Sequence, residues 1–478
     1  MIWIKPGWVP VPDPRGQRTS SWYTAEVSGR LVDMLKMLAV AGLLGMAIAA
    51  GAQSSYAPAK ENQDAVFTAL RAEWAADLRE KKVEASVALY TPDAEFDQPD
   101  GTAIRGTDAL RKLYATVTST YDSRILFFLS KVTETGGKAT DSGQYRELMT
   151  SRADGKRVMI QGGYTTEYHR SSGGKWLIAR QKWEQWGTPI ALDLAAHPVI
   201  ALSFDDLPAA GNLPQGMTRT QIAAEITAHL KAAHMEGTYG FVNGIRMVDN
   251  PDARQALRVW LDAGMNVGSH TWSHPGLPNV TAEAFIADIA RNEPTLAEFG
   301  QMRDWKWFRY PFLWEGETLD KRHAVRQWLS SHGYRVAQVT LDFEDYAWND
   351  AYGRCLAKND SAAIQWLHDS YLANAAEYIQ LGREEQIVAF GHEIPNVLLL
   401  HETAFTTHML PELIAQLRQT GFEFEPIAEV ERDPAYAQDP DAALRYGGTL
   451  PDQFMDAKKL PYPPFDPKPF ERLNTICK

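Results

Sequence analysis

Two short parts of the chain combine residue types that bind metal ions with residue types that move protons. Segment 203–208, Ser-Phe-Asp-Asp-Leu-Pro, holds the adjacent carboxylates Asp205 and Asp206 directly after an apolar run. His270 and His274 also follow a predicted strand, and their four-residue spacing lets both imidazoles reach one ion. Two histidines with one carboxylate leave coordination positions open for water and substrate. We predict a catalytic metal site, although an Asp pair alone is more often part of a turn and a lone histidine is usually structural.

Three later segments carry further groups that suit hydrolysis. Segment 307–312 holds Arg309, which can orient a carboxylate, and a peptide N–H after its proline can face a developing oxyanion. Segments 341–346 and 397–401 supply carboxylates and a terminal histidine, His401. A carboxylate beside a histidine raises the pKa of the imidazole and fixes its orientation, which makes a general acid. The alternative for Arg309 is a structural role in a proline-bounded loop.

These groups fall at strand ends in a part of the chain that alternates strands with helices. Apolar runs at 197–204, 237–242 and 267–269 predict strands, and residues 220–233 and 252–263 predict helices. Such alternation is typical of an α/β fold with a parallel sheet or barrel. Reactive groups in that fold lie at the carboxyl ends of the strands, so we expect the candidate residues to meet at one edge.

Taken in order, the five segments resemble the polysaccharide deacetylase family, the NodB homology domain of carbohydrate esterase family 4, over residues 195–430. The resemblance implies a distorted (β/α) barrel. It also implies that the metal ligands are Asp206, His270 and His274. The metal in this family is usually zinc, and sometimes cobalt, nickel or manganese.

The resemblance implies the catalytic roles as well. Asp205 would be the general base that deprotonates the water activated by the metal, with Arg309 holding its carboxylate. The backbone N–H of Phe312 would help to bind the oxyanion. His401 would protonate the leaving amine or alcohol, supported by Asp345.

The sequence departs from the family pattern at three positions near these motifs. Leu207 replaces the usual glycine after the Asp pair, Phe312 stands where tyrosine is common, and Tyr346 replaces a typical tryptophan. None of these changes removes a ligand or a proton carrier. His392 is a rival general acid, but we favour His401 because it ends a strand whereas His392 precedes one.

Aromatic side chains within or beside the motifs could stack on sugar faces. We predict substrate contacts from four of them: Trp272, Tyr310, Trp314 and Tyr346. Core packing is the alternative, since it is the usual fate of tryptophan, and it applies equally to Trp348.

Residues 57–188 read as a separate α+β domain. Helical periodicity covers 62–90 and a short helix follows near 107–118, before alternating strands at 125–132, 143–150, 156–169 and 175–186. This order resembles the SnoaL-like branch of the nuclear-transport-factor-2-like superfamily, in the opening helix with Trp74, Gly106 before the short helix and the closing strand at 174–178. No nucleophile–base constellation is visible. We therefore predict a binding or dimerisation module in preference to a second active site, and dimerisation through this domain would give a homodimer.

The N-terminal region of the chain suggests export. A positive segment, an uncharged apolar run and an Ala-Gly-Ala site describe a signal peptide at 34–52, with 1–33 as an over-extended start. The alternative is a cytoplasmic tail on a protein anchored in the inner membrane. We expect a periplasmic or secreted protein with an irregular tail at 431–478.

Cys355 and Cys477 are predicted to be unrelated thiols, with one disulfide as the alternative.

Composition limits the partners and leaves three functions open. A net charge of −12 with no long basic run argues against nucleic acid. We expect a metal-dependent hydrolase that removes acetyl groups from a polysaccharide of the peptidoglycan, chitin-oligomer or xylan type. The second hypothesis keeps the site but takes small linear or cyclic amides, because Leu207 and Tyr346 could crowd it. The third is a non-catalytic protein of the cell envelope that binds a ligand.

Overall fold

The computed structural model describes residues 63–299 and 304–478. The chain divides into two compact units, the first ending at Asp193 and the second covering Leu194–Tyr462 and Asp466–Lys478. The predicted signal peptide at 34–52 and the segment 1–33 lie outside the described residues. Within the described ranges, every helix is too short or too polar to cross a membrane.

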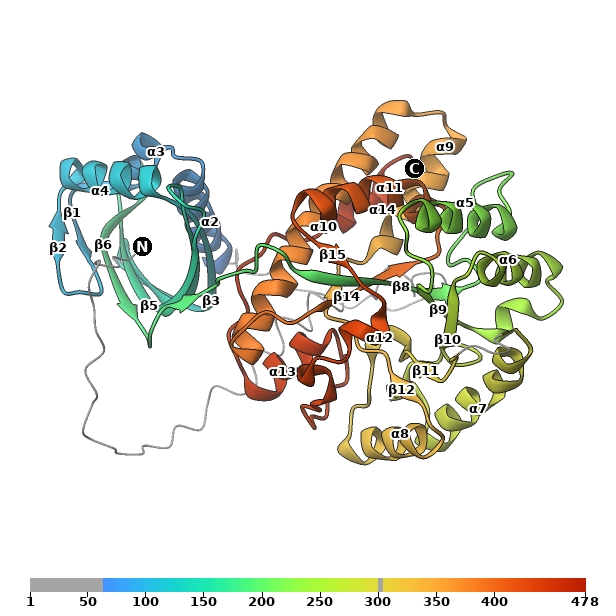
Figure 1. Ribbon diagram of the computed structural model, residues 1–478. Helices are drawn as coiled ribbons and strands as arrows, with labels where there is room; N and C mark the ends of the chain where they lie inside the picture. Colours follow the sequence, from blue (N-terminus) through green and yellow to red (C-terminus); the bar gives the residue numbers. More distant parts are fainter. Residues whose placement is uncertain (1–62, 300–303) are drawn as a thin grey trace, which may run out of the picture. The chain divides into compact units, whose positions relative to one another are not determined.

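The first unit packs three helices, α2 (Gln63–Arg79), α3 (Val83–Ala88) and α4 (Thr107–Thr120), against a curved sheet (Figure 1). The strand order is β2-β1-β6-β5-β4-β3, with β7 paired to β5. The pairs are antiparallel except for β1 with β6. The strands are β1 (Tyr90–Asp97), β2 (Ala103–Arg105), β3 (Tyr121–Thr135), β4 (Lys138–Ser151), β5 (Arg157–Arg170), β6 (Trp176–Gln185) and β7 (Ile190–Ala191). This arrangement confirms the predicted helix-then-sheet order.

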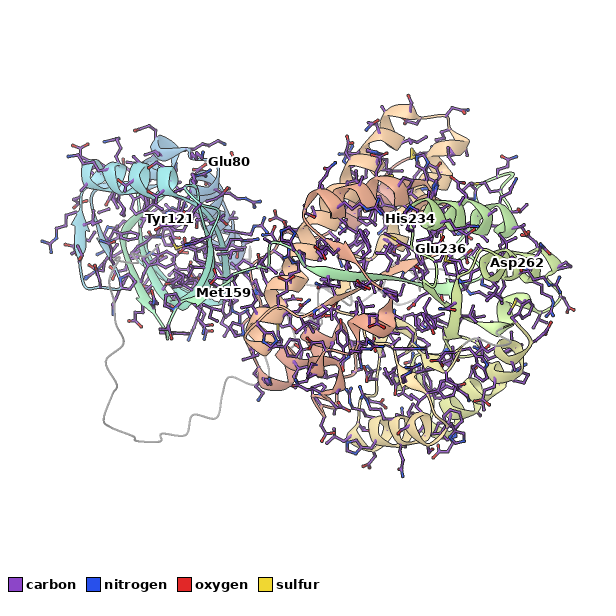
Figure 2. All side chains as sticks on the ribbon, in the orientation of Figure 1. Glu80, Tyr121, Met159, His234, Glu236 and Asp262 are labelled. Carbon is purple, nitrogen blue, oxygen red and sulfur yellow. A yellow bond between two sulfur atoms is a disulfide. The ribbon has the colours of Figure 1, made fainter. Side chains whose placement is uncertain are left out.

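Aromatic rings occupy the space between these helices and the sheet. Trp74 stacks on Trp183 with ring centroids 5.4 Å apart, and Tyr145 meets Trp183 edge to face at 4.7 Å. The hydroxyls of Tyr90 and Tyr114 hydrogen-bond to each other within this core. Side chains fill the interior of the curved sheet (Figure 2). The concave face of the sheet is therefore a packed core.

The second unit is built on one parallel sheet, in the order β12-β11-β10-β9-β8-β14-β13, with β15 paired to β8. The strands are β8 (Val199–Leu207), β9 (Tyr239–Val242), β10 (Asn266–Ser269), β11 (Trp307–Phe308), β12 (Arg335–Val336), β13 (Leu341–Asp342), β14 (Asn396–His401) and β15 (Glu423–Phe424). The edge strands β12 and β13 do not pair in the described part of the chain, so the curved row stays open. The predicted distorted (β/α) barrel is confirmed in this open form.

Helices cover the outer side of this row of strands (Figure 1). They are α5 (Arg219–Ala232), α6 (Pro251–Asp262), α7 (Ala282–Phe299), α8 (Leu319–Ser331), α9 (Asn349–Ala357), α10 (Ser361–Phe390) and α11 (Ala404–Gln419). Along β8 the side chains alternate: Ile200, Leu202 and Phe204 join the outer core with α5, α6, α10 and α11. Ala201 instead packs with Phe241 and with the short α12 (Ile427–Val430) in the inner core. Side chains therefore fill the centre of the barrel, so the groups that could react with a substrate have to lie at the strand ends.

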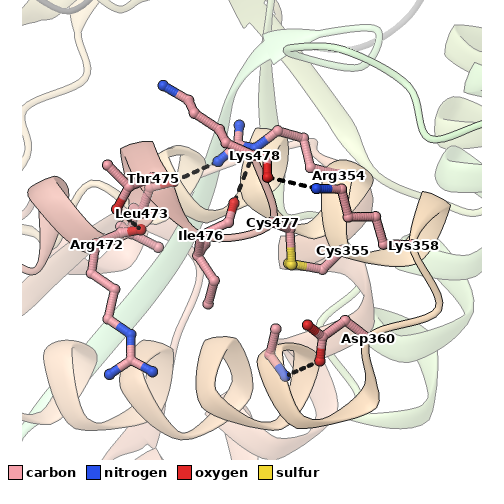
Figure 3. Close-up of a disulfide and its surroundings, with 11 residues drawn as sticks. Arg354, Cys355, Lys358, Asp360, Arg472, Leu473, Thr475, Ile476, Cys477 and Lys478 are labelled. Carbon is pink, nitrogen blue, oxygen red and sulfur yellow. Dashed lines mark hydrogen bonds between the residues drawn. A yellow bond between two sulfur atoms is a disulfide. The ribbon is translucent and has the colours of Figure 1, made fainter.

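The C-terminal residues form ordered structure that the sequence analysis missed. Residues 431–478 contain α13 (Leu450–Lys458), which begins with a capping box at Thr449, and α14 (Phe470–Thr475), so the prediction of an irregular tail is wrong there. Cys355 on α9 and Cys477 form a disulfide, with Cα atoms 5.2 Å apart (Figure 3). The prediction of two unrelated thiols is therefore wrong, because folding brings together residues 122 positions apart.

Replacing both cysteines with serine is expected to lower the free energy of unfolding of the second unit by about 2–4 kcal/mol. The disulfide closes a long loop, and such a crosslink removes many conformations from the unfolded chain. Urea unfolding of the oxidised wild type, the reduced wild type and the double variant measures the effect. The reduced wild type should match the double variant. Equal midpoints for the oxidised and reduced proteins would contradict the expectation.

Candidate active site

The end of β8 places two neighbouring carboxylates in the same site. Strand alternation puts Asp205 on the inner side with Ala201 and Ser203. The next residue would point to the outer side in a regular strand. Asp206 instead has a φ of 67°, in the left-handed region that bulky residues avoid. This local break in the strand lets both carboxylates face the same histidines.

Asp206, His270 and His274 form the predicted ligand group. One ligand atom from each lies within 4.8 Å of the other two. Asp206 Oδ1 is 3.4 Å from His274 Nε2 and 3.8 Å from His270 Nε2. This oxygen is buried and accepts no hydrogen bond from the residues that the structure describes. A buried carboxylate oxygen without a donor, facing two imidazoles, fits a divalent cation such as zinc.

Backbone contacts fix the two imidazoles. His270 Nδ1 is 2.8 Å from the carbonyl oxygen of Arg309, which leaves Nε2 to face the carboxylates. The side chain of Asn243 donates to the carbonyl of His270 at 2.6 Å. His274 has a φ of 60°, and its N–H donates to Thr271 Oγ1 at 3.0 Å. The loop after β10 is thus shaped to return the second histidine to the site.

Burial sets the charge of these ligands. It lowers the pKa of both His270 and His274 to about 4, so both imidazoles are neutral at neutral pH, the form that binds metals. Burial by itself would raise the pKa of Asp206, but Arg246 and the histidines outweigh it and hold that pKa well below its usual range. At neutral pH the ligand group therefore consists of two neutral imidazoles and one ionised carboxylate, the protonation states that bind a divalent cation.

Asp205 is held by Arg309, as predicted. Arg309 Nη1 lies 3.2 Å from Asp205 Oδ1, and both side chains are buried. The same guanidinium donates to the Ala337 carbonyl at 2.7 Å and to Ser203 Oγ at 3.1 Å. Burial raises the pKa of Asp205 to about 6, against the opposing effect of Arg309. A carboxylate with such a pKa, 3.6 Å from His270, is suited to accept a proton.

His401 lies at the end of β14, beside Asp205 in the sheet register. Its Nδ1 is 2.7 Å from Asp345 Oδ1, and its backbone N–H donates to Asp345 Oδ2 at 2.9 Å. Thr406 Oγ1 also donates to Oδ2, at 2.6 Å. Burial alone would lower the pKa of His401, but Asp345 outweighs it and raises that pKa to about 9. The imidazole is thus protonated at neutral pH, as a general acid requires.

Phe312 lies beside the metal ligands. It belongs to the turn η3 (Pro311–Leu313) and has a φ of 59°. Its ring meets the ring of His274 edge to face at 4.5 Å and stacks on Trp314 at 4.7 Å. The peptide predicted to bind the oxyanion is therefore next to the reaction centre.

The four aromatic residues predicted to contact substrate separate into different environments. Tyr346 is 41% exposed and lies against His401, with ring centroids 4.9 Å apart. Tyr310 is only 2% exposed and packs between Phe285 and Phe308, so its predicted substrate contact is wrong. Trp348 is also fully buried. Strand-end position alone could not separate these core rings from exposed ones.

The structure also gives the surroundings of Trp272, Leu207 and His392. The ring of Trp272 packs over Gly244, where a Cβ atom would come within 2.3 Å of it, and under Arg291. Leu207 is fully buried in the outer core, so it does not crowd the site and the reason for small amides is weakened. His392 is exposed before β14, which favours His401.

Two site residues were missed in the sequence. Arg246, in the turn η1 (Gly244–Met247) after β9, lies 3.1 Å from Asp206 Oδ2. Glu402 is buried next to His401, and its Oε2 accepts the Ala209 N–H at 2.7 Å. Burial raises the pKa of Glu402 to about 7. Arg246 follows the end of β9 in the chain, and this position was the feature of the sequence that could have identified it as a site residue.

Comparison with known proteins agrees with both predicted resemblances. Residues 195–337 match the family model for polysaccharide deacetylase, and residues 68–182 match the model for the SnoaL-like domain. Two separate parts of the chain thus match the two families that the sequence resembles, which confirms the predicted resemblances.

Individual relatives match only part of this chain. Chitin deacetylase 2 of Saccharomyces cerevisiae is 39% identical over 26% of this chain and 33% of its own length. Chitin deacetylase 1 of the same yeast is 32% identical over 25% of this chain and 36% of its own length. The chain therefore spans about a third of these relatives. A peptidoglycan deacetylase structure from Bacillus subtilis is 18% identical, with a TM-score of 0.33, over 50% of this chain and 95% of that one.

Asp206→Asn is expected to weaken the binding of one zinc ion by more than about 100-fold. Loss of a hydrogen-bond partner around a metal ligand already costs about 10–100-fold in affinity, and here a charged ligand itself is lost. Calorimetric titration of the metal-free protein with zinc measures the change. The matched control is Asp249→Asn, an exposed carboxylate near η1, which should bind as the wild type does. Wild-type affinity in Asp206→Asn would remove this residue from the ligand set.

Asp345→Asn is expected to lower the pKa of His401 by about 1–3 units. The carboxylate stabilises the protonated imidazole, so its loss makes that form less favourable and moves the titration to lower pH. NMR titration of the histidine rings in metal-free protein should place the wild-type midpoint near 9. Asp350→Asn, an exposed carboxylate five residues along, is the control. An unchanged midpoint in Asp345→Asn would show that another group sets the pKa.

Proposed function

We propose that the second unit is a divalent-metal-dependent hydrolase that removes acetyl groups from a polysaccharide. The observation that carries the proposal is the meeting of three groups at one edge of the sheet. Asp205, held by Arg309, is adjacent in the chain to Asp206 of the ligand group and is paired in the sheet register with His401. A base, a cation site and an acid gathered in one place are what hydrolysis of an amide or ester needs.

Asp205 and the ligand group act on the first half of the reaction. Asp206, His270 and His274 would hold a divalent cation, zinc being the first candidate, and such an ion would supply polarisation of the acetyl carbonyl and a lower pKa for water. Asp205 accepts the proton of the attacking water, and its pKa of about 6 keeps it ionised at neutral pH. Arg309 holds Oδ1 of Asp205, which leaves Oδ2, the oxygen that faces His270, to receive the proton. The backbone N–H of Phe312 is proposed to stabilise the negative charge that develops on the carbonyl oxygen.

His401 acts on the second half. When the carbon–nitrogen or carbon–oxygen bond breaks, the leaving amine or alcohol needs a proton. His401 Nε2 donates it, because Asp345 holds Nδ1 and keeps the ring protonated. The two proton carriers lie on the neighbouring strands β8 and β14, with Asp205 and His401 paired in the register. After the reaction Asp205 releases its proton to solvent and His401 takes up a proton from solvent, which restores both groups.

The substrate class is proposed from the relatives. Two chitin deacetylases match about a quarter of this chain at more than 30% identity. An N-acetylated glucosamine oligomer is therefore the first substrate to test, before peptidoglycan fragments and acetylated xylan. Small amides remain the alternative, and a protein that releases acetate from none of these compounds would be a binding protein.

Export and the role of the first unit are further proposals. The disulfide between Cys355 and Cys477 supports an oxidising compartment, in agreement with a signal peptide at 34–52. We propose a periplasmic or secreted protein. For the first unit we propose a binding or dimerisation role, and a homodimer remains a prediction that light scattering can test.

Asp205→Asn is expected to lower kcat for acetate release from tetra-N-acetylchitotetraose by about 10²–10⁴-fold, the usual contribution of a general base. Asparagine keeps the shape of the side chain but cannot accept the proton. Zinc binding should persist, because Asp205 is not in the ligand group. The control is Asp262→Asn, an exposed carboxylate at the end of α6. Unchanged turnover in Asp205→Asn would refute the assignment of the base.

A further inference from the structure

A row of three aromatic rings leads away from the metal ligands. Phe312 touches His274, Trp314 stacks on Phe312 at 4.7 Å, and Tyr446 meets Trp314 edge to face at 5.3 Å. We call these three residues, Phe312, Trp314 and Tyr446, the aromatic wall. Its last member lies in the C-terminal part of the chain, beyond residues 195–337 that match the deacetylase family. Tyr446 is therefore the part of the wall that lies outside the family match.

Core packing does not explain the first ring of the wall. Phe312 is 51% exposed, although burial is the usual fate of phenylalanine. Its φ of 59° and the φ of 57° at Leu313 put two successive bulky residues in the left-handed region. Such backbone is unfavourable for non-glycine residues and persists where the surroundings enforce it, which is common at binding sites. The turn thus holds a large apolar ring in solvent beside the metal ligands.

The C-terminal segment is held against this turn by close backbone contacts. A Cβ atom on Gly447 would lie 1.8 Å from the carbonyl oxygen of Leu313, so only glycine allows the two backbones to approach so closely. The N–H of Leu444 donates to the Gly316 carbonyl at 3.1 Å. Asp439 pairs with Arg322 at 2.7 Å. These contacts fix Tyr446, which precedes Gly447, over the edge of Trp314.

Sheet order places the wall on one side of the reaction centre. β10, which leads to His274, lies on one side of β8, and β14, which ends in His401, lies on the other. The wall begins at His274, whereas the exposed Tyr346 lies against His401. Exposed rings therefore flank the Asp205–Asp206 pair on both sides. A substrate longer than one sugar ring would therefore contact the aromatic wall on the side of the site where His274 lies.

We propose that the aromatic wall binds the sugar ring next to the acetylated unit, so that the C-terminal segment makes the enzyme prefer oligosaccharides to single sugars. The occupant is a chain of pyranose rings, whose axial C–H groups form apolar patches that pack on aromatic rings. Continuity with the ligand His274 supports this occupant. The inference rests on the proposed deacetylase function and adds the number of sugar rings that the site recognises.

The test compares a long and a short substrate in matched variants. Tyr446→Ala should raise KM for tetra-N-acetylchitotetraose by about 3- to 10-fold, the range for loss of one aromatic contact, with kcat unchanged. Values for the single sugar N-acetylglucosamine should not change. Tyr446→Phe should behave as the wild type because the ring is kept. Tyr352→Ala removes a half-buried tyrosine on α9, stacked on His408, and should leave KM unchanged.

The outcomes separate this inference from the proposed function. If the wild type releases acetate and Tyr446→Ala has the wild-type KM for the tetramer, the wall does not bind sugar and the inference is overturned. Equal KM increases for the tetramer and the single sugar would also overturn it, since the effect would then be on the reaction centre. If the wild type releases no acetate, the proposed function fails. The tetramer then stays intact, and calorimetric titration measures its binding directly; equal affinities for wild type and Tyr446→Ala, or no binding by either, overturn the inference.

Discussion

Two adjacent carboxylates at the end of one strand have to face the same small space, and the second unit is organised around that constraint. Burying a charge is costly unless it is paired. Asp205 is paired with Arg309, and Asp206 with Arg246 and two imidazoles. One oxygen of Asp206 nevertheless accepts no hydrogen bond from the residues that the structure describes. Under the proposed function, a bound cation would satisfy this oxygen, so a group that is unfavourable in the protein alone would contribute to the affinity for a metal.

The supports of the site come from distant parts of the chain. Arg309 connects three of them, because it holds Asp205, offers its carbonyl to His270 and donates to the Ala337 carbonyl on the next loop. Asp345 connects two others through His401 and Thr406. Each catalytic side chain thus has at least one further contact that fixes its orientation. Preorganisation of this kind lets a base and an acid act without rearrangement.

The C-terminal residues belong to the structure of the second unit as much as the strands do. Their contacts include the disulfide from α9 to Cys477, the ion pair of Arg322 with Asp439 and the close approach of Gly447 to Leu313. The same segment carries Tyr446 to the aromatic wall. One stretch of chain therefore contributes to stability and also supplies a ring of the aromatic wall that we propose to bind sugar.

The sequence by itself determined the fold class, the strand ends and the residue types of the site, because these depend on local periodicity and on ordered motifs. It identified Asp206, His270 and His274 as one group, and the structure brings them together. Only tertiary structure decided that Tyr310 is buried and that Cys355 meets Cys477. Burial and pairing depend on contacts between residues far apart in the chain, which no local pattern encodes. The placement of Tyr446 has the same origin, since folding alone brings it to Trp314.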